Sequence, residues 1–212
     1  MGKTQWKPGN MLYPVPAALI SVSNMEEEER RDNLFTVAWT GTVCSDPPMV
    51  SIAVRKERFS HHMIMETGEF VINLTTKKLA RVTDYCGVKS GRDEDKWETC
   101  KLTKVPGEKV SVPLVKESPV NLECKVTQTL ELGSHTLFLA EIVSVWVDEK
   151  YLDEKGQFHL RDADPIAYLH GGYYTLAEKA IGTFGYSVKK AAEKKKSAKK
   201  AGKGKAAGKH KK

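Results

Sequence analysis

Short apolar segments follow one another along most of the chain, and they are rich in β-branched and aromatic side chains. Nearly all of them end at Pro, Gly, Asn, Asp or Ser, which is typical of β-strands separated by turns. The pattern predicts at least six strands, at residues 12–23, 34–43, 49–54, 69–74, 121–132 and 135–149. Neither an internal repeat nor a regular alternation of strands with helices is present, so we expect a mainly β fold.

The segment 136–147 is apolar in both of its alternating sets of side chains. One set is Leu137, Leu139, Glu141, Val143, Val145 and Val147, and the other is Phe138, Ala140, Ile142, Ser144 and Trp146. A barrel or sandwich strand buries one face in its own core, so the other face must be covered by something else. A second subunit would be such a cover, and we therefore expect a homodimer.

Two or three short helices are expected between the strands. Ser60 stands at the N-cap position before an apolar segment, and Gly68 stands where that helix would end. Residues 76–87 have apolar side chains at helical spacing, and residues 92–100 begin with acidic side chains. Strands joined by hairpins, such as the turn at 131–135, indicate a closed or partly closed β-barrel with short peripheral helices.

Composition narrows the class of protein. The chain has 212 residues, of which 40% are hydrophobic and 29% charged, enough for one domain with a sizeable core. No apolar run approaches the roughly 18 residues that span a bilayer. The first residues lack the apolar stretch of a signal peptide, so we expect a cytoplasmic protein. The four cysteines form no C-x-x-C motif, which favours reduced thiols over a disulfide framework or a zinc site.

The net charge of +7 is unevenly distributed. Residues 189–212 contain 12 lysines and a single acid, Glu193, whereas residues 1–188 hold 22 basic and 26 acidic residues. The sequence predicts a folded domain over 1–188 and a disordered Lys/Ala-rich tail over 189–212. Such a tail either binds polyanions such as nucleic acid without specificity or is a solubilising appendage.

Residues 33–62 are the most informative stretch for chemistry. The common nucleotide loops, catalytic motifs and metal-ligand clusters are missing from the sequence. Here, however, a strand of small and hydroxyl side chains leads through an Asp-Pro-Pro turn to Arg55, Arg58 and Ser60 at a predicted helix start. Exposed strand amides can bond the edge of a flat ring system, and arginines beside a helix N-terminus can bind a phosphate. The pattern therefore suits a flat ligand that carries a phosphate.

Several ordered motifs resemble one known family. They are YPVPAALISVS at 13–23, Asn33 with Thr36, Val37, Ala38, Trp39 and Gly41, Ser45–Pro48, Arg58–His61, GEFVINL at 68–74, and Gly133–His135. Over residues 10–176 this order resembles the flavin reductase-like family, in particular its flavoredoxin branch with the FMN-binding split barrel. The resemblance implies FMN held noncovalently at a homodimer interface.

The family's functional residues carry over as follows. The isoalloxazine ring would contact Asn33, Thr36, Val37, Ala38 and Trp39. The ribityl chain and phosphate would contact Ser45, Arg55, Arg58, Ser60 and His61, with Lys96 as a further contact. NADH or NADPH would approach His135, Tyr168 and His170, although Ser134 replaces the family's usual Asp and puts that binding in question. The resemblance implies neither a catalytic side chain nor a metal.

These features predict an FMN-dependent oxidoreductase that passes electrons from NAD(P)H to free flavin, ferric complexes or a protein acceptor. One alternative is an FMN electron carrier with no NAD(P)H site of its own. Another is a polyanion- or nucleic-acid-binding protein that acts through the lysine tail, against which the acidic body of the chain argues.

Overall fold

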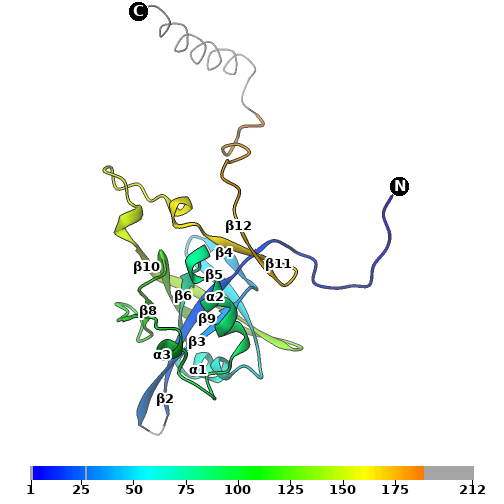
Figure 1. Ribbon diagram of the computed structural model, residues 1–212. Coiled ribbons are helices and arrows are strands. Elements are labelled where there is room, and N and C mark those ends of the chain that lie inside the picture. The colour runs from blue at the N-terminus through cyan, green and yellow to red at the C-terminus, as the bar shows by residue number, and fades with distance from the viewer. Residues whose placement is uncertain (1, 27, 189–212) are drawn as a thin grey trace, which may run out of the picture. The chain divides into compact units, whose positions relative to one another are not determined.

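The computed structural model describes residues 2–26 and 28–188 (Figure 1). The chain divides into two compact units, residues 1–176 and 177–212. Every helix and strand of the described residues lies in the first unit. The predicted tail, 189–212, lies outside the described residues.

Seven strands form the main sheet, in the order β3-β2-β6-β9-β10-β5-β4, with every neighbouring pair antiparallel. They are β2 (Ala18–Glu26), β3 (Glu29–Val37), β4 (Thr40–Ser45), β5 (Pro48–Arg55), β6 (Glu69–Leu74), β9 (Val120–Leu132) and β10 (His135–Val147). The two edge strands, β3 and β4, are consecutive in the chain and only Ala38 and Trp39 separate them. The sheet must therefore curl until its two edges approach each other at this junction, which produces a barrel that is open between β3 and β4.

Two small sheets lie beside the barrel. One joins β1 (Val15–Pro16), β11 (Ile166–Leu169) and β12 (Gly172–Thr175), and the other pairs β7 (Lys104–Val105) with β8 (Leu114–Val115). The sequence pattern does not predict β7, β8, β11 or β12, because strands of two to four residues are too short to display an alternation.

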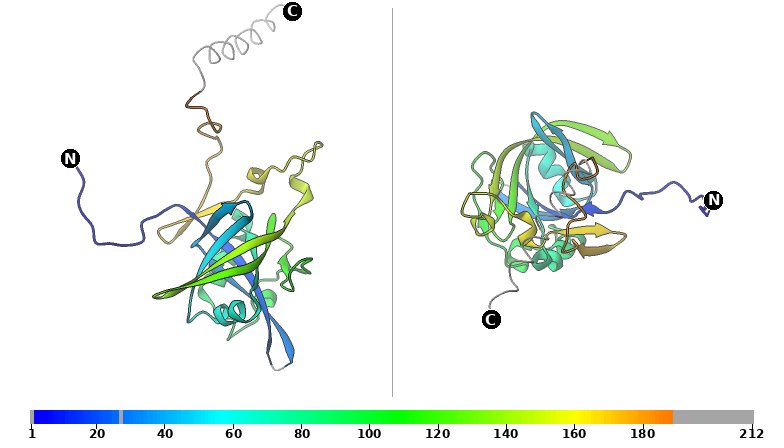
Figure 2. Two further views of the ribbon diagram at one scale, coloured as in Figure 1. Left: turned by 180° about the vertical axis from the view of Figure 1, so that it is seen from behind. Right: turned by 90° about the horizontal axis from the view of Figure 1, so that it is seen from above.

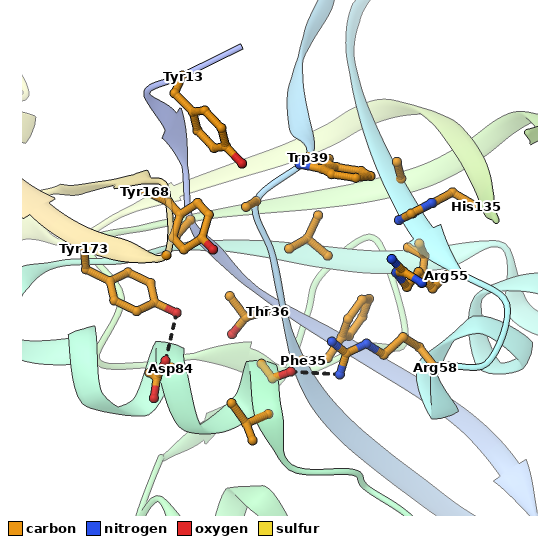
Figure 3. Close-up of a pocket in the computed structure, with 18 residues that line it drawn as sticks. Tyr13, Phe35, Thr36, Trp39, Arg55, Arg58, Asp84, His135, Tyr168 and Tyr173 are labelled. Carbon is orange, nitrogen blue, oxygen red and sulfur yellow. Dashed lines mark hydrogen bonds between the residues drawn. The ribbon is translucent and has the colours of Figure 1, made fainter. Parts of the chain in front are cut away.

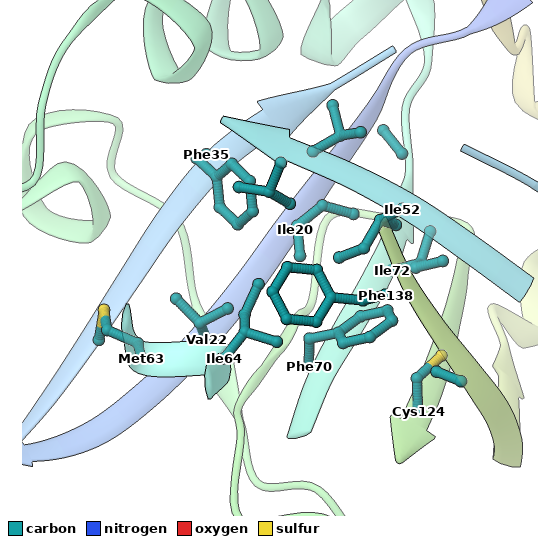
Figure 4. Close-up of a cluster of buried hydrophobic side chains, with 14 of the residues drawn as sticks. Ile20, Val22, Phe35, Ile52, Met63, Ile64, Phe70, Ile72, Cys124 and Phe138 are labelled. Carbon is teal, nitrogen blue, oxygen red and sulfur yellow. The ribbon is translucent and has the colours of Figure 1, made fainter. Parts of the chain in front are cut away.

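The barrel interior is filled by aliphatic and aromatic side chains from both the strands and α1 (Phe59–Thr67) (Figure 4). Phe70 and Phe138 are fully buried there, together with Met63 and Ile64 of α1. Seen from above, α1 lies within the outline of the strands (Figure 2). This helix therefore closes the core rather than lying on the periphery.

Other elements cover the outside of the barrel. A 3₁₀ turn, η1 (Lys77–Leu79), leads into α2 (Ala80–Val88), and α3 (Lys96–Thr99) follows; their Cys86 and Trp97 pack on Leu19 and Leu34 of the barrel. Residues 110–114 pack on β6 and on Val143 of β10. Part of the outer face of β10 is thus covered by its own chain. Two further 3₁₀ turns, η2 (Glu149–Tyr151) and η3 (Leu160–Ala163), follow β10.

The structure confirms a mainly β barrel with short helices, and it corrects several local predictions. The strand expected at 34–43 is broken at Ala38 and Trp39. Helix α1 begins at Phe59 with Arg58 in the N-cap position, so Ser60 is already helical. Gly68 ends that helix with a φ of 65°, as its sequence position predicted. Among the described residues, no helix is long and apolar enough to cross a membrane.

Candidate functional site

Two adjoining pockets open beside the β3–β4 junction. The first, here called the aromatic pocket, has a volume of about 440 Å³ (Figure 3) and is lined by Tyr13, Ala17, residues 35–39, residues 53–55, Arg58, Asp84, Gly87, Val88, His135, Tyr168, Gly171 and Tyr173. The second, here called the basic pocket, has a volume of about 380 Å³ and is lined by Asn33, Phe35, Arg55, residues 57–60, residues 89–92 and Lys96. Phe35, Arg55 and Arg58 line both.

The end of β3 forms the central wall of the aromatic pocket. Pairing of β3 with β2 ends at Val37, and pairing of β4 with β5 begins at Thr40. The Trp39 carbonyl still accepts a hydrogen bond from the Ala53 amide at 2.9 Å, but neither Ala38 nor Trp39 has a partner in the strand ladders, so their backbone N–H groups can meet the edge of a ligand. Helix α2 packs closely on the end of β3, where Thr36 Oγ1 donates to the carbonyl of Thr83. A Cβ at Gly87 would lie 3.3 Å from the Thr36 Cβ.

Aromatic side chains stand on two sides of this pocket (Figure 3). Tyr13, Tyr168 and Tyr173 lie on one side, while Trp39 and His135 lie on the other with ring centroids 4.7 Å apart. The Tyr173 hydroxyl donates to Asp84, and burial together with that carboxylate raises the pKa of Tyr173 to about 12. A flat aromatic ligand fits between such walls.

His135 is held in place at the turn between β9 and β10. Its Nδ1 lies 2.8 Å from the Ser134 hydroxyl oxygen, so the serine supplies a hydrogen bond at this turn. Burial, together with the nearby Arg55, lowers the pKa of His135 below its usual range. The imidazole is therefore neutral at pH 7 and presents an uncharged face to the pocket.

The basic pocket is strongly cationic. Its lining contains five basic residues, Arg55, Arg58, Lys89, Arg92 and Lys96, and one acidic residue, Glu57. Two of these cations, Lys89 and Arg92, come from the loop after α2. Arg58 holds the start of that loop, because its guanidinium donates to the carbonyl of Gly87 at 2.8 Å. Converging cations of this kind bind a phosphate dianion.

Lys96 is the most buried of these cations, with 2% of its surface exposed. Its ammonium donates to the carbonyls of Lys89 at 3.1 Å and Cys86 at 3.5 Å, at the end of α2. Burial lowers the pKa of Lys96. Neutral carbonyls satisfy its hydrogen bonds without cancelling its charge, so an anion in the basic pocket would be the natural counter-ion.

The structure brings most of the predicted residues together. Thr36, Val37, Ala38, Trp39, Arg55, Arg58, His135 and Tyr168 line the aromatic pocket, and Asn33, Ser60 and Lys96 join Arg55 and Arg58 in the basic pocket.

Three predicted residues line neither pocket. Ser45 lies at the far end of β4, opposite Pro48. His61 turns away and hydrogen-bonds Thr136 at 2.8 Å. His170 lies in the β11–β12 turn with its ring 4.5 Å from that of Tyr13. Ser45, expected at the ribityl chain, and His61, expected at the phosphate, therefore lie outside both pockets of this chain.

Sequence reasoning missed other lining residues. Tyr13, Asp84 and Val88 reach the aromatic pocket, and residues 89–92 reach the basic one. The segment 89–92 reads as an ordinary charged surface loop, so no local signal could have assigned it to a site.

A β-barrel that is open between β3 and β4, with an aromatic pocket adjoining a cationic one, defines the split-barrel class of protein. The chain belongs to the family described as "Flavin reductase like domain", whose model matches residues 11–177. The flavoredoxin of Desulfovibrio vulgaris (Miyazaki F) is 33% identical, with a TM-score of 0.78 over 87% of this chain and 99% of that chain.

Two further proteins are similar. The flavoredoxin of Methanosarcina acetivorans is 28% identical, with a TM-score of 0.79 over 88% of this chain and 98% of that chain. An NADH-dependent FAD reductase of Streptomyces globisporus is 26% identical over 62% of this chain and 69% of its own length. Residues 10–176, over which the sequence motifs resemble this family, nearly coincide with the matched range.

Proposed function

We propose that the two pockets together hold one FMN molecule, with the isoalloxazine ring in the aromatic pocket and the phosphate in the basic pocket. The observation that carries this proposal is the shared boundary at Phe35, Arg55 and Arg58. FMN consists of a flat ring system and a phosphate dianion joined by a short polar chain. An aromatic pocket that shares one wall with a cationic pocket matches that order of groups. The buried charge of Lys96 fits the same group, because it lacks a neutralising carboxylate in its hydrogen bonds.

Each part of the site then has a role. The backbone at Ala38 and Trp39 bonds the polar edge of the ring, and the aromatic side chains exclude water from its faces. Asn33 donates to Ser60 and holds that hydroxyl at the wall of the basic pocket. Arg58 and Lys96 supply charge-assisted donors for the phosphate. When bound, FMN would supply the redox chemistry, accepting a hydride and passing electrons onward.

The electron donor in this proposal is NADH or NADPH. Support comes from the family, from the relative named as an NADH-dependent FAD reductase, and from the neutral His135, whose ring is tilted by 37° against that of Trp39 in the wall of the aromatic pocket. The acceptor would be free flavin, a ferric complex or a protein. The second candidate is an electron carrier without an NAD(P)H site of its own. The presence of Ser134 where the family usually has Asp favours this candidate. Steady-state oxidation of NADH and NADPH with added FMN distinguishes the two.

A homodimer is part of the same proposal. Apolar side chains are exposed along the β9–β10 hairpin, including Leu132 at 51%, Val145 at 56% and Trp146 at 43%. Exposed apolar surface of this kind is typical of a subunit interface. Sedimentation equilibrium at micromolar protein with FMN present should give twice the chain mass, and a monomer mass would contradict the dimer.

The phosphate assignment is tested by comparing FMN with riboflavin, which lacks the phosphate. Arg58→Ala should weaken FMN binding by about ten- to a hundredfold, the loss typical of one charged hydrogen bond. Riboflavin affinity should change little. Arg81→Ala is the matched control, because Arg81 lies on the exposed side of α2 and lines neither pocket. Equal losses for both ligands, or no loss for either, would overturn the assignment.

A further inference from the structure

Two of the four cysteines come together in the fold. Cys86 lies in α2 and Cys100 is the C-cap residue of α3, and their Sγ atoms are 4.0 Å apart. Cys86 is fully buried and Cys100 is partly exposed. Nothing in the sequence indicates this pair, because 13 residues separate the two thiols and they form no C-x-x-C motif. The contact exists because both helices pack on the same face of the barrel.

The segment between these cysteines forms walls of both pockets. Gly87 and Val88 line the aromatic pocket, and residues 89–92 and Lys96 line the basic pocket. The two thiols stand at the base of this loop, where its ends meet. A covalent bond between them would close the loop at its base and restrict the motion of every wall residue that it carries.

We propose that Cys86 and Cys100 form a reversible intramolecular disulfide when the protein meets hydrogen peroxide. The partly exposed Cys100 reacts first: its sulfur attacks one peroxide oxygen, the O–O bond breaks, and a sulfenic acid and one water form. The Cys86 sulfur then attacks the Cys100 sulfur, the S–O bond breaks, the S–S bond forms, and a second water leaves. Two thiols are oxidised and one peroxide is reduced to two waters. A dithiol reverses the reaction by exchange.

The environment of the two thiols determines the rate of this oxidation. Burial raises the pKa of the Cys86 thiol to about 12 and also raises that of Cys100, while the nearby Lys96 ammonium acts in the opposite direction on both. Both thiols are therefore protonated at pH 7, and oxidation should accelerate as the pH rises. The sulfurs must approach to about 2 Å, and Cys100 can supply that movement because it ends a helix of only four residues.

The experiment uses the full chain and does not depend on what the pockets bind. The protein is treated with hydrogen peroxide at pH 8, remaining thiols are alkylated in denaturant, and a nonreducing tryptic digest is analysed by mass spectrometry. We expect peptide 82–89 joined to peptide 97–101, lighter than their sum by two hydrogen atoms, and separated again by dithiothreitol. Cleavage after Arg81, Lys89, Lys96 and Lys101 makes these two peptides diagnostic.

Two variants complete the test. Cys44→Ser is the matched control, because Cys44 is also partly exposed but lies on β4, and this variant should still form the linked peptide. Cys100→Ala should abolish it. Trypsin can also cut the native protein after Lys89 or Arg92, between the two cysteines. On a nonreducing gel the two halves of the cut chain should separate when the thiols are reduced and stay joined when the disulfide has formed. Two outcomes would overturn the proposal. One is that Cys86 and Cys100 are both recovered alkylated at peroxide doses that oxidise Cys44, and the other is that the disulfide links found involve Cys44 instead.

Discussion

The Asn33 carboxamide donates a hydrogen bond to the Ser60 hydroxyl, with 2.8 Å between Nδ2 and Oγ. This bond ties β3 to the first turn of α1 at the wall of the basic pocket. The backbone of Gly91 closes over the same amide so tightly that a Cβ there would lie 2.3 Å from Asn33 Oδ1. A strand, a helix and the α2–α3 loop thus meet at one buried carboxamide.

Gly91→Ala should damage the basic pocket specifically. The added methyl group would force Asn33 away from Ser60, with an overpacking cost of about 1–3 kcal/mol in the free energy of unfolding. If the displaced Ser60 hydroxyl no longer meets the phosphate, about 1.4 kcal/mol of binding free energy is lost, and FMN affinity should fall about tenfold. Fluorescence titration and urea unfolding measure the two effects. Gly41→Ala is the control, because no heavy atom lies within 4 Å of its added Cβ; equal effects of the two substitutions would contradict this reading.

Glu123 should be important for stability. Its carboxylate is fully buried and accepts hydrogen bonds from the backbone amides of residues 108–110 and from the Trp146 indole. Burial alone would raise the pKa of Glu123, yet these donors hold it below the usual range. Glu123→Ala leaves them unpaired and should cost about 3 kcal/mol or more in urea unfolding. The exposed Glu154→Ala should cost little, and a similar loss in both variants would refute this role.

Stability should rise with pH through the titration of His61. Desolvation lowers the pKa of His61 in the folded chain. Thr136 donates to Glu131 and so accepts from the neutral His61 ring. The unfolded chain therefore binds the proton more readily, and the stabilisation present above the unfolded value of about 6.5 is lost as the pH falls through the folded pKa. Urea unfolding between pH 5 and 8 should show a smaller pH dependence in His61→Gln than in wild type. An unchanged profile would contradict this assignment.

His135→Ala should separate donor binding from cofactor binding. The ring packs on Trp39 at the aromatic pocket and does not line the basic one. Loss of the ring contact that His135 would make with the nicotinamide, about 0.5–1.5 kcal/mol, should raise the KM for NADH or NADPH about two- to tenfold. The dissociation constant for FMN should rise less than the KM does, because Trp39 stays on the same wall of the aromatic pocket and the phosphate contacts of the basic pocket are intact. Stopped-flow reduction and fluorescence titration test the two parts, and a loss confined to FMN binding would place His135 at the cofactor instead.

The sequence by itself determined the strands and turns whose signals are local. The predicted strand at 69–74 is β6 residue for residue, and Gly68 and Gly133 take the positive φ values that their turns require. Alternation of side chains and turn chemistry depend only on neighbouring residues, so they can be read from the chain. The motifs around Asn33 and Arg58 also indicated one side of the pocket wall.

Only the tertiary structure decided which distant segments complete the site. The chain passes from one edge of the sheet to the other at Ala38 and Trp39, and this crossing breaks a strand that its composition predicted to be continuous. The loop 89–92 reached the basic pocket, and Cys100 came within 4.0 Å of Cys86, because α2 and α3 pack on the outer face of β2 and β3. These contacts depend on burying apolar surface between elements far apart in sequence, and no local pattern records which partner each element will meet.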